Sequence, residues 1–365
     1  LQHGDFRVRK RPVQSIPTRT GLPPSRRFVI HVGLPKTGTK YIQHFFTRVA
    51  DAMRVEGIDY PTDGWKPDDI FGHHELNEEL NTVPNQRLQS AFRKMRSSGY
   101  STILLSCEGF SALNVSSLEY LLSLVGTAGV DIVFYCRRWS DWIPSIWQQS
   151  IRQGGSLGFP EHYANVLTMA DSHPGINYAI FFDKFAKVFG SDCLNLISYS
   201  NLSDNSVDIL EPFLDDILHW IPEIQILPER IHESMGILTS EIVRNINWMS
   251  HQKGLKIGDD VYRMLQRCCD LNECFSDIIA DSEKILGEYV VSMEIDDQAP
   301  GLRDIYSQLN ENFGTYLLRS ELGQGIFSPR KRSVQYVSQN CLLDGKLAAN
   351  LNRIFDTVCS VLPLL

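Results

Sequence analysis

Apolar residues along the chain follow two spacings, and the switch between them is clearest near the N-terminus. Phe28–Val32 is a short apolar run rich in β-formers, which predicts a buried parallel strand. From Gly38 onward apolar residues recur at helical spacing, which predicts a helix packed on the sheet. The loop between them begins at Gly33 and ends at Gly38. A strand, a glycine-bracketed loop and a helix form a phosphate cradle, because the N–H groups and the helix dipole meet at one spot.

Strand and helix patterns continue to alternate along the chain. Strands are predicted at 57–61, 100–106, 131–136 and 193–199, and helices at 86–98, 139–153, 177–189, 212–221, 236–253 and 302–318. We expect the segment 154–180 to be a substrate-covering loop with short helices. This order predicts an α/β fold of the P-loop-like type, a three-layer α/β/α arrangement around a mostly parallel sheet, with extra C-terminal helices over the sheet.

Composition narrows the class of protein. The chain has 365 residues, of which 43% are apolar, enough for one large α/β domain or two modest ones. No run approaches the length of about 18 apolar residues that a membrane span needs. A net charge of −8 argues against general nucleic-acid binding. An anionic ligand must therefore be held by local positive charge and oriented N–H groups.

Charge and proline content divide the chain into three parts. Residues 1–27 carry seven basic residues against one acid, with prolines at 12, 17, 23 and 24. Such a segment cannot bury a core, so we expect a flexible basic arm at 1–26, a solvated leader in preference to a binding arm. One domain is expected at 27–322, and a C-terminal extension with a basic loop and a helix at 323–365.

The eight cysteines are too few and too scattered for a disulfide scaffold. Cys107 and Cys136 lie in apolar strand-like runs and are expected to be buried thiols. Cys268, Cys269 and Cys274 lack the CxxC spacing and the nearby histidine pair of a zinc site, so no metal is predicted.

The residue order in the first loop decides between kinds of phosphate chemistry. A nucleotide-hydrolysing P-loop needs Gly-x4-Gly-Lys-Ser/Thr. Here Thr39 and Lys40 follow Gly38 in the swapped order, and Lys36 lies inside the loop, which disfavours an ATPase or GTPase. The loop instead closely resembles the 5′-phosphosulfate loop of sulfotransferases that use 3′-phosphoadenosine 5′-phosphosulfate (PAPS). The residues that match are Pro35, Lys36, Thr37, Gly38, Thr39 and Lys40. The alternative is a glycine-rich βα turn without a ligand.

A second motif follows the strand at 131–136. The same family binds the 3′-phosphate of PAPS with an arginine at a strand end and a serine eight positions later, and Arg137 and Ser145 match that spacing. A guanidinium suits this task because it grips a phosphate through paired N–H bonds. Trp139 stands where the family usually has proline, and Arg138 is either a second phosphate contact or a surface residue. For the basic loop 328–332 a solvated turn is favoured over a phosphate contact.

Three residues are candidates for the general base. His73 and His74 are adjacent, so at most one is expected to reach a substrate, and the alternative is a surface pair at a helix N-terminus. Histidine suits proton abstraction near neutral pH. Glu108 follows a predicted strand, where it would lie at the ligand-binding edge of a parallel sheet, or else cap the next helix. The resemblance favours a histidine or glutamate in this role without choosing among the three.

The resemblance covers roughly residues 27–250 and implies in-line transfer of a sulfuryl group from PAPS to an acceptor hydroxyl or amine, without a metal. Lys36 would neutralise the charge on the leaving group, the N–H groups of Thr37–Lys40 would hold the 5′-phosphate, and Arg137 with Ser145 would hold the 3′-phosphate. The product is 3′-phosphoadenosine 5′-phosphate. The competing functions are a P-loop small-molecule or nucleoside kinase and a non-catalytic nucleotide-binding relative.

The acceptor is expected to be a small molecule or a glycan, with a carbohydrate as first choice. Tryptophans are candidates for a ring-stacking cleft, although burial in the core is the favoured alternative. They are Trp65, Trp139, Trp142 and Trp147. We expect the protein to be cytoplasmic, or else in the Golgi lumen if an anchor precedes the chain. The sequence does not predict an oligomeric state.

Overall fold

The computed structural model of the protein describes residues 26–61, 71–82, 85–126, 129–222, 235–255, 261–271 and 273–361. The basic arm expected at 1–26 lies, apart from Arg26, outside the described residues, and so does Trp65.

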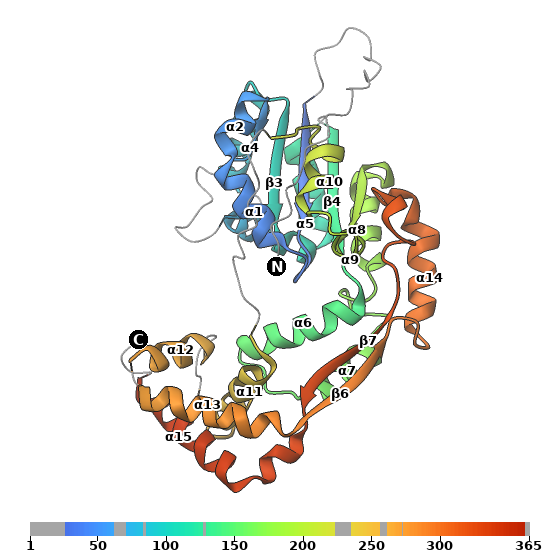
Figure 1. The fold of residues 1–365 in the computed structure, drawn as a ribbon. Helices are drawn as coiled ribbons and strands as arrows, with labels where there is room; N and C mark the ends of the chain where they lie inside the picture. The colour runs from blue at the N-terminus through green and yellow to red at the C-terminus, as the bar shows by residue number, and fades with distance from the viewer. Residues whose placement is uncertain are drawn as a thin grey trace.

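A five-stranded parallel sheet forms the centre of the larger lobe (Figure 1). Its strands, in spatial order, are β2 (Ile58–Asp59), β3 (Thr102–Cys107), β1 (Arg27–Val32), β4 (Gly129–Cys136) and β5 (Leu194–Ser198). All neighbouring strands pair in parallel, and Val32 is in register with Cys107 on one side and Phe134 on the other. The carboxyl ends of β1, β3 and β4 therefore meet at one edge, where Gly33, Glu108 and Arg137 follow them.

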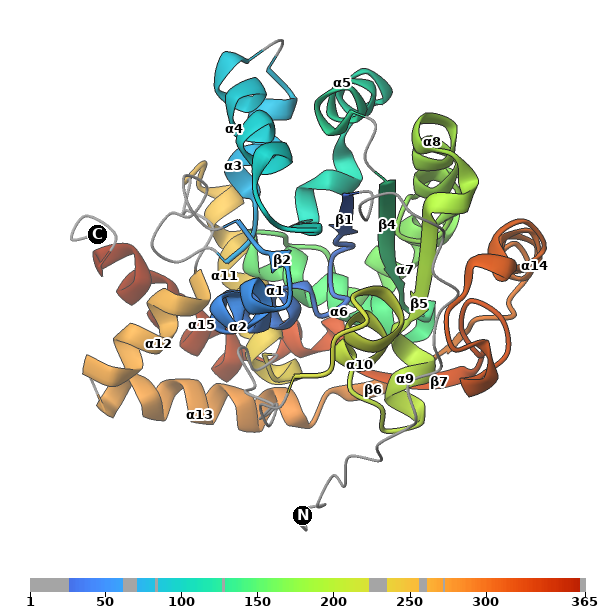
Figure 2. The same cartoon turned by 90° about the horizontal axis from the view of Figure 1, so that it is seen from above.

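Helices cover both faces of this sheet (Figure 2), which confirms the predicted α/β class. One face packs against α1 (Thr39–Arg48), α2 (Ala50–Val55), α9 (Tyr199–Asp204), α10 (Leu210–Pro212) and a π-turn at Phe213–Ile217. The other face packs against α3 (His74–Leu80), α4 (Gln86–Ser97), α5 (Val115–Val125) and α8 (Ala179–Phe189). The strands are buried on both faces, as their continuous apolar runs require.

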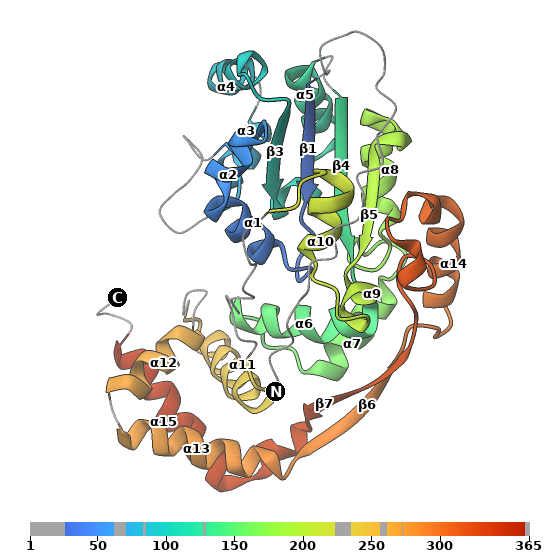
Figure 3. The same cartoon turned by 45° about the horizontal axis from the view of Figure 1, so that its top comes forward.

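A second, mainly helical lobe lies beyond the carboxyl edge of the sheet (Figure 1). Its elements are α6 (Trp139–Arg152), α7 (Phe159–Thr168), α11 (Ile237–Gln252), α12 (Val261–Leu271), α13 (Glu273–Gly287) and α15 (Gly345–Val361). An antiparallel ribbon of β6 (Val290–Asp296) and β7 (Lys331–Val337) runs between this lobe and α14 (Leu302–Phe313) beside the sheet (Figure 3). Short 3-10 turns complete the described fold, at Glu108–Ala112, Ser191–Cys193, Gly314–Tyr316, Ser320–Leu322 and Gln339–Leu343.

The segment 154–180 contains the ten-residue helix α7, in keeping with the short helices expected there. Two later helices differ from their predictions. The helix expected at 236–253 exists as α11, but it packs on α6, α13 and α15 and not over the sheet. The helix expected at 302–318 ends at Phe313, and Leu318 N–H instead donates to Leu196 O (2.8 Å) at the β5 edge. Helical spacing showed that these segments were helical, but it held no information about which surface each one packs on.

The C-terminal helix is part of the second lobe. α15 packs on α11, α12 and α13, so the segment 323–365 shares a core with helices that precede it in the chain. All eight cysteines are free, and Cys107 and Cys136 are buried thiols, as predicted. Within the described ranges, no helix is both long and apolar enough to cross a membrane.

Candidate active site

The loop between β1 and α1 depends on two glycines that admit no side chain. A Cβ at Gly33 would lie 2.8 Å from Thr39 Cγ2 and 2.9 Å from Glu108 Cα, so the loop passes in close contact with the end of β3. Gly33 N–H donates to Cys107 O at 3.1 Å. Gly38 caps α1 in the left-handed region (φ 82°), where a Cβ would also lie 2.4 Å from Ile209 Cδ1.

Two hydrogen bonds, one within the loop and one from α6, hold the loop in shape. Thr37 Oγ1 donates to Leu34 O (2.7 Å), and Trp142 Nε1 on α6 donates to Pro35 O (3.0 Å). Lys36 has a φ of 66°, a conformation that a residue with a side chain adopts only where its surroundings enforce it. These hydrogen bonds and the left-handed backbone at Lys36 therefore fix the shape of the loop.

The start of α1 has the features of an anion site. The first helical hydrogen bond runs from Ile42 N to Gly38 O, so the preceding N–H groups lie before the helical ladder. Thr39 is 2% exposed, and its Oγ1 is buried without a hydrogen-bond partner among the described residues. Burial, followed by the positive charges of Arg137 and Arg152, lowers the pKa of Lys36. Positive charge is thus concentrated at the helix N-terminus, and α1 has no acidic residue in its first turn.

The structure brings Arg137 to this loop. Arg137 Nη1 donates to Lys36 O at 2.5 Å, and its contact with Ser145 Oγ is longer, at 3.5 Å. The guanidinium lies 5.1 Å from the centre of the Tyr199 ring, and Tyr178 OH donates to the Arg137 carbonyl (2.6 Å). Arg137 Nε is buried and has no partner in the part of the chain that the structure describes. Burial lowers the pKa of Arg137, as expected for a cation that has little water around it.

Arg138 is neither a surface residue nor free to contact a phosphate, the two roles expected for it. Its side chain is 1% exposed, forms ion pairs with Asp141 (3.2 Å) and Asp204, and donates from Nε to Ser328 O (2.6 Å). Asp141 also accepts from Arg330 and Arg332 at 2.6 Å each. Arg330 and Arg332 are therefore held at this acidic pair, whereas Lys331 pairs with Glu294 and Asp296 of β6. The basic residues lie at the start of β7 and not in a solvated turn.

Asp297, at the end of β6, fixes the first turn of α6. It is buried, and its carboxylate accepts from Ser140 N (2.8 Å), Ser140 Oγ (2.9 Å) and Arg330 N (3.0 Å). Burial raises the pKa of Asp297, and the three hydrogen bonds oppose that shift. Because Ser140 lies three positions after Arg137, this network sets the direction in which α6 leaves the site.

His73 links two parts of the backbone. Ser106 N donates to His73 Nδ1 at 3.0 Å, and Nε2 lies 2.8 Å from Pro61 O. These bonds fit a neutral ring with its proton on Nε2. Burial lowers the pKa of His73 to about 4. His73 therefore joins β3 to the segment after β2, and neither ring nitrogen is left to take a proton from a substrate.

Glu108 and His74 remain as candidate bases. Glu108 is the first residue after β3, and no hydrogen bond to its carboxylate forms within the described residues. Burial raises the pKa of Glu108, while the nearby charges of Lys40 and Lys36 oppose the rise. His74 Nδ1 lies 3.6 Å from Cys107 Sγ. Burial, followed by the charge of Lys40, lowers the pKa of His74.

Sequence reasoning missed three residues that shape the site. Trp142 was expected in the core and is 3% exposed, but its indole N–H also holds the Pro35 carbonyl. Trp139 and Trp147 are core residues, as favoured. Tyr199 stacks on Arg137, and Asp297 anchors α6, although nothing in the local sequence around either one indicates these contacts.

Among the described residues, no cluster of three potential metal ligands occurs.

Comparisons with known proteins are sparse. No protein-family model matches the chain, and no curated protein matches it. The crystal structure of a sulfotransferase from Alicyclobacillus acidocaldarius is similar to it with a TM-score of 0.35 and 15% sequence identity. That match covers 64% of this chain and 97% of the other chain. A likeness at this score and identity does not bear on function.

Proposed function

We propose that this protein transfers a sulfuryl group from PAPS to a hydroxyl or amine of an acceptor. The observation that carries the proposal is the meeting of two motifs that are far apart in the sequence. Arg137 Nη1 lies 2.5 Å from the Lys36 carbonyl although 101 residues separate them. A loop suited to a 5′-phosphosulfate and an arginine suited to a 3′-phosphate thus adjoin, as one bisphosphorylated nucleotide requires.

Unpaired polar atoms in the site fit such a nucleotide. Thr39 Oγ1 and Arg137 Nε are buried without partners among the described residues, and a buried polar atom normally has one. The N–H groups at the start of α1 are donors for the 5′-phosphate. Arg137 and Ser145 are donors for the 3′-phosphate, which positions the nucleotide without entering the chemistry.

PAPS supplies the activated sulfuryl group when it is bound. Lys36 and the N–H groups of Thr37–Lys40 stabilise the negative charge that grows on the 5′-phosphate oxygen as its bond to sulfur breaks. The acceptor oxygen or nitrogen forms the new bond to sulfur, and its proton passes to a base. We assign the base to Glu108, because its carboxylate is largely buried, has no hydrogen-bond partner in the described chain and lies beside Lys36 and Lys40. His74 is the alternative.

Calorimetric titration with 3′-phosphoadenosine 5′-phosphate tests the proposal. The wild type should bind in the micromolar range, and Arg137→Ala should weaken binding by roughly 30-fold or more, because a charged hydrogen bond to phosphate contributes about 2 kcal/mol. Lys36→Ala should weaken binding as well. The matched control is Arg303→Ala, which also removes one positive charge but from an exposed side chain on α14.

ATP with magnesium is the control ligand. A preference for magnesium ATP would replace the proposal with a kinase function. Equal nucleotide binding by the wild type and Arg137→Ala would show that the arginine does not hold the 3′-phosphate, and the proposal would fall.

A further inference from the structure

Three tryptophans of α6 hold three different parts of the chain. The indole N–H of each one donates to a backbone carbonyl outside the helix: Trp139 to Ile176 O (3.1 Å), Trp142 to Pro35 O (3.0 Å) and Trp147 to Leu157 O (2.9 Å). All three side chains are buried. Of the three bonds, only that of Trp142 reaches the loop between β1 and α1. The other two tryptophans are therefore matched references for what the Trp142 bond does.

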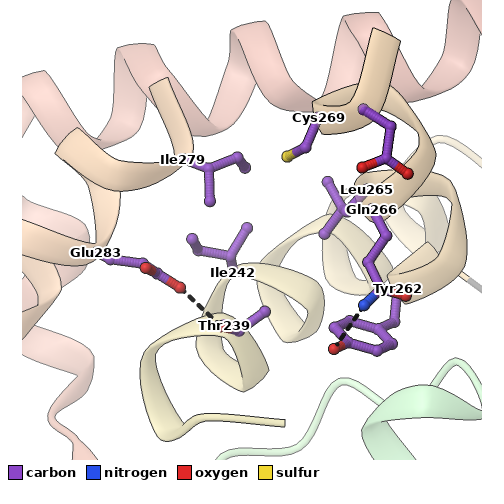
Figure 4. Close-up of a pocket in the computed structure, with 9 residues that line it drawn as sticks. Thr239, Ile242, Tyr262, Leu265, Gln266, Cys269, Ile279 and Glu283 are labelled. Carbon is purple, nitrogen blue, oxygen red and sulfur yellow. Dashed lines mark hydrogen bonds between the residues drawn. The ribbon is translucent and has the colours of Figure 1, made fainter. Parts of the chain in front are cut away.

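The two ends of α6 lie in different surroundings. At the far end, the Arg152 guanidinium lies 4.8 Å from the centre of the Tyr262 ring. Tyr262 lines a pocket of about 450 Å³ between α11, α12 and α13 (Figure 4). No tryptophan is among the described residues that line this pocket. The helix thus ends in the helical lobe, and it meets the loop near its start, where Trp142 lies.

Donors hold three successive carbonyl oxygens of the loop. They are Thr37 Oγ1 to Leu34 O (2.7 Å), Trp142 Nε1 to Pro35 O (3.0 Å) and Arg137 Nη1 to Lys36 O (2.5 Å). A trans peptide group is planar, and its N–H points opposite to its C=O. The N–H groups of Lys36 and Thr37 therefore point away from Trp142 and Arg137. Neither one donates to the backbone of the described residues, so both are left as donors for an anion.

The ring of Trp142 is clamped, which fixes the direction of its N–H. A Cβ at Gly175 would lie 2.3 Å from Cζ2 and Cη2 of Trp142, so the ring rests on the Gly175 backbone. The His173 ring meets the indole in a T-shaped contact, with 5.6 Å between ring centres. Gly175 N donates to His173 Nδ1 (3.1 Å), which closes the turn that carries both residues.

The conformation of Lys36 depends on these bonds. A φ of 66° is unfavourable for a residue that has a Cβ. The bonds at Pro35 O and Lys36 O fix the peptide groups on either side of Lys36 Cα and so hold it in this conformation. Arg137 is also assigned to the 3′-phosphate, so Trp142 is the donor from α6 whose sole task in this scheme is the loop. Without its N–H, the Pro35 peptide group can rotate and Lys36 can relax.

We propose that Trp142 is a positioning residue for the nucleotide. Through Pro35 O it fixes the backbone of Lys36 and Thr37, whose N–H groups receive the 5′-phosphate. This inference rests on the proposed function, since it concerns the same donor site. Trp142 acts through the loop and supplies neither a proton nor a charge to the reaction.

A matched pair of variants tests this role by calorimetric titration of the full chain. Trp142→Phe should weaken binding of 3′-phosphoadenosine 5′-phosphate about tenfold or more, because Pro35 O loses its donor and the loop loses its fixed shape. Trp147→Phe removes the same kind of bond from an equally buried ring on the same helix. It should change the affinity no more than about twofold. Equal affinities of the two variants would overturn the inference.

A second ligand separates positioning from a general loss of packing. Adenosine 3′-phosphate lacks the 5′-phosphate that the loop receives, so Trp142→Phe should weaken it no more than about twofold. An equal loss for both ligands would show that Trp142 only supports the fold. Hydrogen exchange gives a readout without any ligand: Trp142→Phe should raise exchange in residues 33–38, whereas Trp147→Phe should leave it unchanged. Unchanged exchange in both variants would also overturn the inference.

A subtler replacement guards against misfolding of Trp142→Phe. At position 142, 3-benzothienylalanine keeps the size of the ring and replaces its N–H with sulfur. It should keep the Tm of the wild type within a few degrees and reproduce the loss of nucleotide affinity. Wild-type affinity in this variant would overturn the role of the N–H.

The titrations distinguish failure of this inference from failure of the proposed function. If the wild type binds the nucleotide and Trp142→Phe binds it equally well, only the positioning role falls. If the wild type binds no nucleotide, the proposed function is overturned and the positioning role falls with it.

Discussion

Replacing Gly33 with alanine tests how closely the loop between β1 and α1 packs against Thr39 and Glu108. The added Cβ would lie 2.8 Å from Thr39 Cγ2 and Thr39 Oγ1, and 2.9 Å from Glu108 Cα. Thr39 cannot move aside easily, because it is 2% exposed in the packed start of α1. Glu108 Cα is backbone at the end of β3, so it can shift only together with the strand.

The cost of this substitution can be worked from those contacts. Overpacking a well-packed site by one methyl group costs about 1–3 kcal/mol of unfolding free energy. We expect the upper half of that range, because two of the three atoms belong to a buried side chain and the third is backbone. A loop displaced by a few tenths of an ångström also misplaces the Thr39 hydroxyl and the first N–H groups of α1. Affinity for 3′-phosphoadenosine 5′-phosphate should fall at least tenfold, which corresponds to about 1.4 kcal/mol.

Thermal unfolding and calorimetric titration measure the two effects on one preparation. A destabilisation of about 2 kcal/mol should lower Tm by several degrees, since roughly 2–4 °C per kcal/mol is typical of domains of 150–250 residues. The control is Gly99→Ala, because a Cβ at Gly99 meets no atom within 4 Å. If Gly33→Ala matches the wild type in both Tm and affinity, the close passage of the loop against Glu108 is wrong.

Three further predictions concern charged and titratable groups. Glu108→Gln should lower the rate of sulfuryl transfer to an acceptor alcohol about 10²–10⁴-fold. In the wild type, the rate should fall as the pH drops through a value above 4.5, because burial raises the pKa of Glu108. An unchanged rate in Glu108→Gln would move the base to His74. Arg138→Met should cost about 1–3 kcal/mol in urea unfolding, because Ser328 O loses its buried donor and Asp141 and Asp204 keep only Arg330 and Arg332. The control Arg332→Met removes a side chain that is 43% exposed and should cost no more than about 1 kcal/mol. Equal losses would contradict the buried role of Arg138. Burial lowers the pKa of His73 from 6.5 to about 4 in the folded protein, so its contribution to stability is present above pH 6.5 and is lost as the pH falls toward 4. This loss is on the order of 3 kcal/mol, and His73→Asn should reduce the slope of unfolding free energy against pH over that window. An unaltered slope would speak against the buried neutral ring.

The strand, loop and helix from β1 to α1 could be predicted from sequence because their determinants are local. Gly33, Lys36 and Gly38 lie within six consecutive residues, and strand and helix periodicities flank them. Arg137 could be placed at the same sheet edge because parallel strands end together, and the structure puts it 2.5 Å from the Lys36 carbonyl. The strand expected at 57–61 exists as the shorter β2, Ile58–Asp59.

The choice among the three base candidates could not be made from sequence. His73 and His74 are the same residue type in adjacent positions, and only the tertiary structure separates them. His73 meets Ser106 and Pro61, whereas His74 meets Cys107. The two neighbours differ in burial, since His73 is 2% exposed and His74 is only partly buried.

By itself the sequence determined the α/β class, the order of the strands along the chain and the position of the glycine-bracketed first loop between a strand and a helix. These properties follow from hydrophobic period and from residue identity over short spans. The tertiary structure alone decided that Arg138 is a buried ion-pair residue, that Asp297 anchors α6 and that α11–α13 enclose a pocket at the far end of α6. Each of these depends on contacts between segments that are remote in sequence, and periodicity fixes which face of an element is apolar but not which partner that face meets.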